Sequence, residues 1–192
     1  MHPRPYSYLS LEHDDDFNWN YGICLAATGD YTAAECTLLK IESMTYTSEA
    51  VYLKWLSRCL IANDKAQNAW ELYLEHENDD NLKMSLVESM ANDFYRYGHF
   101  HYAARAFEIL FHLGQHDKQV LWEALRGACV GVFQNLISMA CSEKSNTELL
   151  LKSKHELLTS ILPILRSKQN PQAEHIINTI RDWLKVNESS LK

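Results

Sequence analysis

The fold is decided by the segment LVESMANDFYRYGHFHYAARAFEILF, residues 86–111. Apolar residues recur there with a helical period, a polar turn interrupts them at Gly98, and a second helical pattern begins at Phe100. The segment also contains two histidines, two arginines and an aspartate, which together suggest chemistry. Repetition of the pattern elsewhere would instead indicate packing, because a helical array reuses the same inward positions in every unit.

The pattern occurs in two further segments, residues 17–41 and 51–76. Each of the three copies has one turn residue, in order Gly29, Asp64 and Gly98. Each second helix carries a small inward residue, in order Ala34, Ala69 and Ala103. These alanines lie 35 and 34 residues apart, and a helix–turn–helix unit of that period is the tetratricopeptide repeat.

Close packing of the two helices in each unit explains the small residues. We expect the helices to cross at Gly22 with Ala34, Ser57 with Ala69, and Ala91 with Ala103. Larger side chains should fill the grooves beside the crossings, namely Leu25, Leu38, Leu60, Tyr73, Phe94 and Phe107. One such unit cannot bury its apolar face alone, so neighbouring units must stack. The histidine-rich segment is therefore predicted to be the third unit of an array.

The chain after residue 113 departs from the period. Helices are predicted over 118–141, over 147–167 with a kink at Pro163, and over 171–187 as a cap. The earlier helices are predicted over 15–28, 31–42, 48–62, 66–77, 82–97 and 100–113. The predicted fold class is all-α, a tetratricopeptide-repeat α-solenoid of about nine helices with a C-terminal capping helix. The expected divisions are an N-terminal extension at 1–14, three repeats at 15–113, and a degenerate helical pair with the capping helix at 114–192.

Composition and charge exclude several classes. Six glycines and four prolines in 192 residues are few for a sheet protein, and 46% hydrophobic residues suffice for a core. The net charge of −7 argues against a nucleic-acid partner. Residues 1–140 carry 10 basic and 19 acidic residues, whereas residues 141–192 carry 8 and 6. No apolar run approaches 18 residues, so no membrane insertion is expected. The five cysteines form no C-x-x-C pair and are expected to be buried, structural thiols.

The sequence offers several candidate sites for chemistry, each of which also has a simpler interpretation. A zinc site would use His99, His101, His112 and His116, but no carboxylate or cysteine stands at ligand spacing. The acidic run at 14–16 lacks the calcium-loop pattern and suits a helix N-terminus instead. The glycines of GACVG, residues 127–131, are expected to allow a close helix crossing. No phosphate loop or nucleophile elbow occurs, so we predict no catalytic residue, cofactor or metal.

The first helix of each unit should face a concave surface. The residues expected to be exposed there, and proposed as candidate partner-binding residues, are Trp19, Lys54, Arg58, Asn92, Tyr95 and Arg96. Lys54 with Arg58, and Asn92 with Arg96, are i, i+4 pairs that share a helix face. The alternative is that these side chains form an ordinary solvated surface.

Several sequence blocks contain residues that the general repeat pattern does not specify. They are VYLKWLSRCLIANDKAQNAWELYLEH at 51–76, RGACVGVFQ at 126–134 and ILRSKQNPQAEHIINTIRDWLK at 164–185. Together they resemble the C-terminal part of the intraflagellar transport protein 56 family, the tetratricopeptide-repeat subunits of intraflagellar transport complex B. Family members carry more repeats upstream, so the chain corresponds to about the last third of them.

The resemblance implies a non-enzymatic scaffold or adaptor subunit of complex B. Its implied partners are other complex B subunits, subunit 46 in particular, and ciliary motility cargo needed for cilium assembly. Its implied location is the cilium or flagellum and the ciliary base, on the cytoplasmic side. The alternative function is a general repeat adaptor, of the chaperone-cofactor type, that grips an acidic C-terminal peptide in its concave groove. That carboxylate clamp is incomplete, because Trp19 occupies one of the positions where a polar donor is needed.

Overall fold

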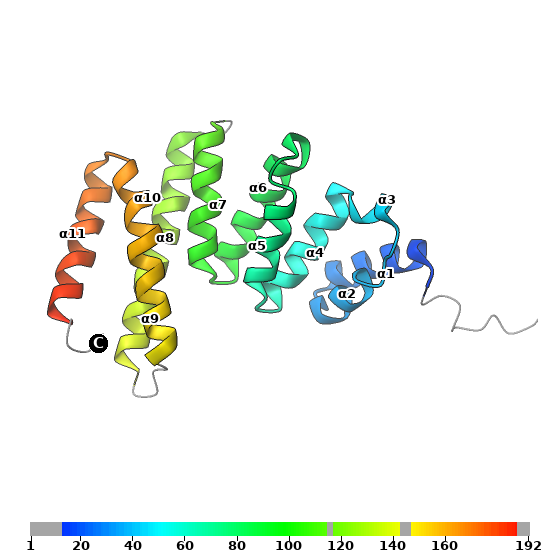
Figure 1. Ribbon diagram of the computed structural model, residues 1–192, viewed down its shortest axis with the longest axis horizontal. Coiled ribbons are helices and arrows are strands. Elements are labelled where there is room, and N and C mark those ends of the chain that lie inside the picture. The colour runs from blue at the N-terminus through cyan, green and yellow to red at the C-terminus, as the bar shows by residue number, and fades with distance from the viewer. Residues whose placement is uncertain (1–12, 115–116, 143–146, 188–192) are drawn as a thin grey trace, which may run out of the picture. The chain divides into compact units, whose positions relative to one another are not determined.

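The computed structural model describes residues 13–114, 117–142 and 147–187 (Figure 1). The described residues form helices and contain no strand, which confirms the all-α helical-repeat fold of the tetratricopeptide class. The chain forms two compact units that divide between Asp93 and Phe94. Each unit is described by itself below.

The first unit consists of helix hairpins that stack in chain order. Its helices are α1 (Asp15–Thr28), α2 (Tyr31–Leu38), α3 (Met44–Thr47), α4 (Ala50–Ala62), α5 (Ala66–Glu75) and the larger part of α6 (Asp80–Arg96). Helix α1 packs on α2, α2 on α4, and α4 on α5. The single-turn helix α3 was not predicted, and α2 ends at Leu38 rather than at residue 42.

All three predicted turns have the same backbone geometry. Gly29, Asp64 and Gly98 have φ values of 91°, 62° and 81°. In each case the turn N–H donates to the carbonyl three residues before it, and the next N–H donates to the carbonyl five residues before it. This is the Schellman helix end, whose left-handed residue is normally glycine. The identical hydrogen bonds show that the repeats share one register.

The small residues predicted at the helix crossings lie in the interior. Ala34, Ser57, Ala69, Ala91 and Ala103 are fully buried. A Cβ atom added to Gly22 would stand 2.7 Å from Leu38 Cδ2, so α1 rests directly on that leucine. Gly22 is therefore a point of close approach, as predicted, but the residue nearest to it is Leu38 and not the predicted Ala34.

Polar side chains fasten the first repeat to the second. The carboxylate of Glu35, which is only 5% exposed, accepts hydrogen bonds from Asn63 Nδ2 at 2.7 Å and from Lys65 Nζ at 2.6 Å. Asp15 accepts from the backbone N–H groups of Glu42 and Ser43 at 3.1 and 2.9 Å. Asp14 caps α1 by accepting from Phe17 N, as predicted for the acidic run. Asp15 thus holds the chain between α2 and α3.

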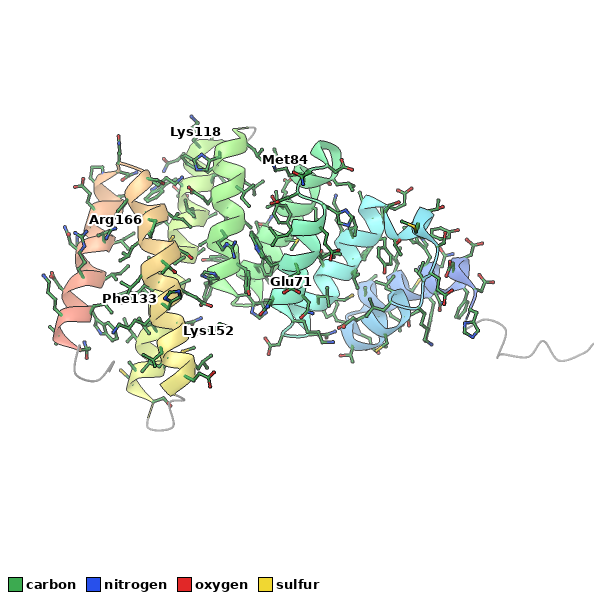
Figure 2. All side chains as sticks on the ribbon, viewed as in Figure 1. Glu71, Met84, Lys118, Phe133, Lys152 and Arg166 are labelled. Carbon is green, nitrogen blue, oxygen red and sulfur yellow. The ribbon has the colours of Figure 1, made fainter. Side chains whose placement is uncertain are left out.

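The second unit contains the two long predicted helices and the cap. Its elements are α7 (Phe100–Leu113), α8 (Lys118–Cys141), α9 (Thr147–Glu156), the π-helical turn η2 (Leu157–Ile161), α10 (Leu162–Ser167) and α11 (Pro171–Val186). Helix α8 packs on α7, α9, η2 and α11, and α10 packs on α11. In Figure 2, Lys118 marks the start of α8 and Lys152 projects from α9.

The expected kink at Pro163 takes the form of a π turn. Proline has no N–H to offer the carbonyl of Thr159, and its ring would collide with that carbonyl in a regular α-helix. The helix widens just before it, and Leu162 N–H donates to Leu157 O, five residues back. The π turn therefore carries one helical run through 147–167 despite the proline.

The glycines of the GACVG block do allow close packing, as predicted. A Cβ on Gly131 would stand 2.5 Å from Phe100 Cγ, and one on Gly127 would stand 2.9 Å from the Tyr95 hydroxyl. Helix α8 is long and apolar enough to cross a membrane by length and composition alone. Its apolar face, however, is covered by α7, α9, η2 and α11, which is the arrangement of a core helix.

The cap helix α11 forms as expected. Asn170 caps it by accepting from Gln172 N at 2.8 Å, and Pro171 occupies its first turn. Ala173, Ile177 and Ile180 are buried. Three further apolar residues of the helix, Ile176, Trp183 and Leu184, are half-buried. One apolar side of α11 thus closes the second unit.

Candidate partner-binding surface

A hollow of about 260 Å³ lies on the first unit between α4 and α6. Val51, Lys54, Trp55 and Arg58 of α4 line it together with Ser89 of α6. The period of α4 places these four residues on one side of the helix, at i, i+3, i+4 and i+7. Val51 is 48% exposed. The hollow therefore combines an open apolar edge with two cationic side chains.

Arg58 is held in place by two contacts. Its Nε lies 2.9 Å from Oδ2 of Asp93, and its guanidinium carbon lies 5.2 Å from the centroid of the Trp55 ring. The Asp93 side chain is 7% exposed, against 37% for Arg58. Arg58 therefore neutralises a buried carboxylate while one edge of its guanidinium remains available. Charge reversal at Arg58 would disturb the fold, contrary to the simple exposed position expected from the sequence.

Trp19 has a packing role. Its ring lies 5.2 Å from Tyr46 and stacks on Tyr52 at 6.2 Å, and the residue is half-buried. The stack joins α1 to α3 and α4. The clamp position in the first repeat is thus filled by an indole packed between two tyrosines.

The remaining predicted residues lie near the end of α6. Asn92 is exposed, and its side-chain amide donates to the Glu88 carbonyl at 3.0 Å. Tyr95 is 44% exposed, with its ring edge-on to Phe100 and its hydroxyl above Gly127. Arg96 is exposed, with its guanidinium 6.0 Å from the Tyr97 ring. The structure thus brings Lys54 and Arg58 together in the hollow. The other four predicted residues do not line it.

Sequence reasoning missed Val51, Trp55 and Ser89, as well as the Asp93 partner of Arg58. A signal for the hollow was present, because Val51 and Trp55 share the helix face of Lys54 and Arg58. The Asp93 contact spans 35 residues, which is one repeat period. Periodicity could therefore have suggested it, although nothing in the local sequence specifies the pair.

The histidines weighed as zinc ligands lie in different surroundings where the structure describes them. Among the described residues, no group of three or more histidine, cysteine or carboxylate side chains could hold a metal ion. His112 lies 2.8 Å from Glu108, and His116 falls outside the described residues. His101 faces a second hollow of about 170 Å³, which Lys152, Ser153 and Glu156 also line. Burial, aided by Arg105 and Lys152, lowers the pKa of His101 to about 4.

The cysteines divide into two kinds. Cys59 and Cys129 are buried, and burial raises the pKa of each thiol to about 12. Cys24, Cys36 and Cys141 are exposed, so the expectation that all five would be buried was wrong for these three. All five thiols are free. The two buried thiols are packing residues with negligible thiolate at neutral pH.

The repeated hairpins, their shared turns and the cap define a helical-repeat protein of the tetratricopeptide class. The chain belongs to the intraflagellar transport protein 56 family, whose sequence model matches residues 6–192. It is 26% identical over 185 residues to the intraflagellar transport protein 56 homolog of Caenorhabditis elegans. That alignment covers 93% of this chain and 29% of the relative, so the chain spans less than a third of the relative's length. No solved structure matches.

Proposed function

We propose that the chain is a non-enzymatic scaffold segment of intraflagellar transport complex B. It docks other complex B subunits, with subunit 46 as the first partner to test, and supports delivery of motility cargo to the cilium. Its place of action is the ciliary base and the cytoplasmic side of the cilium. Family membership supports the transport role, and the α4 hollow supports docking as the means.

The α4 hollow is the surface on which the docking proposal rests. Interaction hot spots favour a few large aromatic or cationic side chains in a partly desolvated recess, surrounded by less important contacts. Trp55 and Arg58 have that character, and their mutual contact fixes both before a partner arrives. Preorganised side chains lose less conformational entropy on binding. Lys54 adds a cation for which the described residues show no ion pair.

The direct test is a charge reversal that leaves the fold intact. Lys54→Glu reverses a charge in the hollow and keeps both members of the Arg58–Asp93 pair, whereas Arg58→Glu would remove that pair. Lys118→Glu is the matched control, because Lys118 is exposed in the other unit and a carboxylate suits the first turn of α8. Both variants are expressed in ciliated cells, and the complex B proteins that co-purify with each are quantified against the parent.

Lys54→Glu should reduce co-purification of complex B proteins several-fold, and Lys118→Glu should not. Equal recovery with both variants would reject the α4 hollow, and Arg96→Glu would then test the exposed end of α6. Absence of complex B proteins from the parent preparation would reject the scaffold role itself. The adaptor alternative predicts instead that an acidic C-terminal peptide binds the parent and that amidation of its carboxylate abolishes binding.

A further inference from the structure

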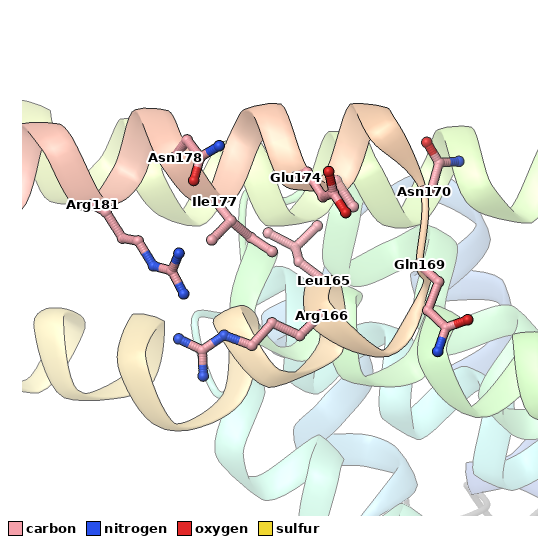
Figure 3. A pocket seen from close by; sticks show the side chains of 9 residues that line it. Leu165, Arg166, Gln169, Asn170, Glu174, Ile177, Asn178 and Arg181 are labelled. Carbon is pink, nitrogen blue, oxygen red and sulfur yellow. The ribbon is translucent and has the colours of Figure 1, made fainter.

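A groove of about 420 Å³ runs between α10 and α11, at the end of the chain away from the α4 hollow in sequence (Figure 3). Its floor is apolar, because Leu165, Ala173 and Ile177 meet there. Gln169, Asn170 and Asn178 add side-chain amides to its rim. The groove thus offers both apolar surface and hydrogen-bonding groups to a ligand.

Two arginines converge on one end of this groove. Arg166 comes from α10 and Arg181 from α11, and Figure 3 shows both guanidinium groups pointing to the same end, near Asn178. The third charged residue, Glu174, lies farther along, toward Asn170. Within the part of the chain that the structure describes, neither guanidinium has an ion-pair partner. Two converging cations repel each other, and a carboxylate placed between them would remove that cost.

We infer that this groove is a docking site for an acidic peptide segment of a partner protein. A carboxylate of the segment accepts hydrogen bonds from Arg166 and Arg181, and an adjacent apolar side chain lies over Leu165 and Ile177. Guanidinium groups suit this role because they bind carboxylates through two parallel hydrogen bonds. The basic balance of residues 141–192, with 8 basic and 6 acidic residues, is complementary to such a ligand.

A peptide fits the groove better than a nucleic acid or a membrane surface does. Polyanion binding draws on many cations at once, and its strength scales with the number of phosphates neutralised. Here two arginines face an apolar floor, on a chain whose net charge is −7. Long-range attraction for a polyanion is therefore weak. Recognition must come from a short-range pairing of one or two carboxylates with a neighbouring apolar group.

The test uses a defined probe and does not depend on complex B. Fluorescein-labelled Glu-Glu-Leu-Asp-Leu-Glu-Glu is titrated with the full chain by fluorescence anisotropy, beside a neutral analogue in which glutamine and asparagine replace the acids. The groove variant is Arg166→Glu with Arg181→Glu. The control variant is Lys118→Glu with Lys152→Glu, which makes the same change in net charge on exposed residues outside the groove. Circular dichroism melting establishes that both variants are folded.

The proposal predicts saturable binding of the acidic probe to the parent. The groove variant should bind at least tenfold more weakly, and the control variant should stay within about threefold of the parent. The neutral probe should also bind at least tenfold more weakly. Equal losses in the two variants, equal binding of an oligothymidine of similar charge, or no binding of the acidic probe to the parent would each overturn it. None of these outcomes bears on the α4 hollow.

Discussion

The ring of Phe100 lies directly on Gly131, so close that a Cβ at position 131 would stand 2.5 Å from the ring. Phe100 is the first residue of α7, and Gly131 lies in the middle of α8. The ring is half-buried at the α7–α8 contact, and the three atoms nearest that Cβ position are Cγ, Cδ1 and Cδ2, the part of the ring closest to the Phe100 backbone. Helices α7 and α8 can therefore pack this closely only because residue 131 is a glycine.

Gly131→Ala should lower the free energy of unfolding by about 1–3 kcal/mol, as small-to-large core changes do. The loss should appear even though alanine is the better helix former by about 1 kcal/mol. Gly127→Ala is the matched control, because its nearest atom is the hydroxyl of the exposed Tyr95 at 2.9 Å, which can swing aside. Urea unfolding followed by circular dichroism measures both. Equal stability of the two variants would show that the Phe100 contact is not tight.

The Arg58–Asp93 pair should stabilise the first unit. Arg58→Met removes the cation and leaves the Asp93 carboxylate buried without its partner, which should cost about 1–3 kcal/mol. Replacing both, as Arg58→Met with Asp93→Leu, should cost less than the two single changes summed. A coupling of about 0.5–3 kcal/mol is expected from the double-mutant cycle. Lys54→Met on the same helix face is the control and should change stability by no more than about 0.5 kcal/mol. If the losses of the two single variants simply added in the double variant, Arg58 and Asp93 would not be interacting.

The thiols should react in two separate groups. The thiolate is the reactive form, and a pKa of about 12 leaves Cys59 and Cys129 essentially protonated at pH 8. Titration of the folded chain with Ellman's reagent should therefore give a rapid phase from the three exposed cysteines. The other two should react only as fast as the chain unfolds, and denaturant should release them. Five equally fast thiols would show that neither unit is closed around its buried cysteine.

The shared turn geometry predicts which residues the repeats tolerate. Gly29 has φ of 91°, and a Cβ there would meet no atom within 4 Å. The cost of a substitution therefore comes from the left-handed backbone conformation alone and not from a steric clash. Gly29→Ala should cost about 1 kcal/mol, the penalty of a left-handed conformation for an L-residue. Gly29→Asn should cost less, because asparagine tolerates this conformation, as Asp64 does at the same place in the second repeat. Thermal melts of the two variants should keep that order.

Sequence reasoning succeeded where the signals are local. The ranges 15–28, 100–113 and 118–141 agree with α1, α7 and α8 to the residue. Each has a marked end, such as the left-handed Gly29 and Gly114 or the capping side chain of Asp117. Helix α3 was missed because its single turn is held by distant groups, notably the contact of the Tyr46 ring with Trp19. A periodic pattern over four residues carries too little information to predict a helix.

The candidate site was predicted less completely for the same reason. Lys54 and Arg58 follow from the helix period, and the structure places both in the α4 hollow. The pairing of Arg58 with Asp93 and the burial of Trp19 depend on how successive repeats approach each other. Those distances are set by packing between helices far apart in the chain. The groove between α10 and α11 went unnoticed because Arg166 and Arg181 belong to different helices and converge only in three dimensions.

His101 should make the second unit sensitive to acid. Its Nδ1 is buried without a hydrogen-bond partner, and its pKa falls from 6.5 to about 4. The folded state therefore resists protonation between these values, whereas the unfolded chain takes up the proton. The free energy of unfolding is therefore highest above the pKa of the unfolded state, and it declines as the pH falls from about 7 to about 4. After allowance for partial exposure of the ring, the loss should reach about 1–2 kcal/mol.

The groups around His101 allow this pH dependence to be assigned. Glu156 lines the same hollow, and burial raises its pKa, so its own contribution has the opposite sign and is lost as pH rises. The difference between the parent and His101→Gln, measured by urea unfolding at pH 7.5, 6 and 4.5, isolates the histidine. Lys152→Gln removes one of the cations that lower the pKa of His101, so the NMR titration midpoint of His101 should rise in this variant. A midpoint near 6.5 in the parent would contradict the burial of this ring.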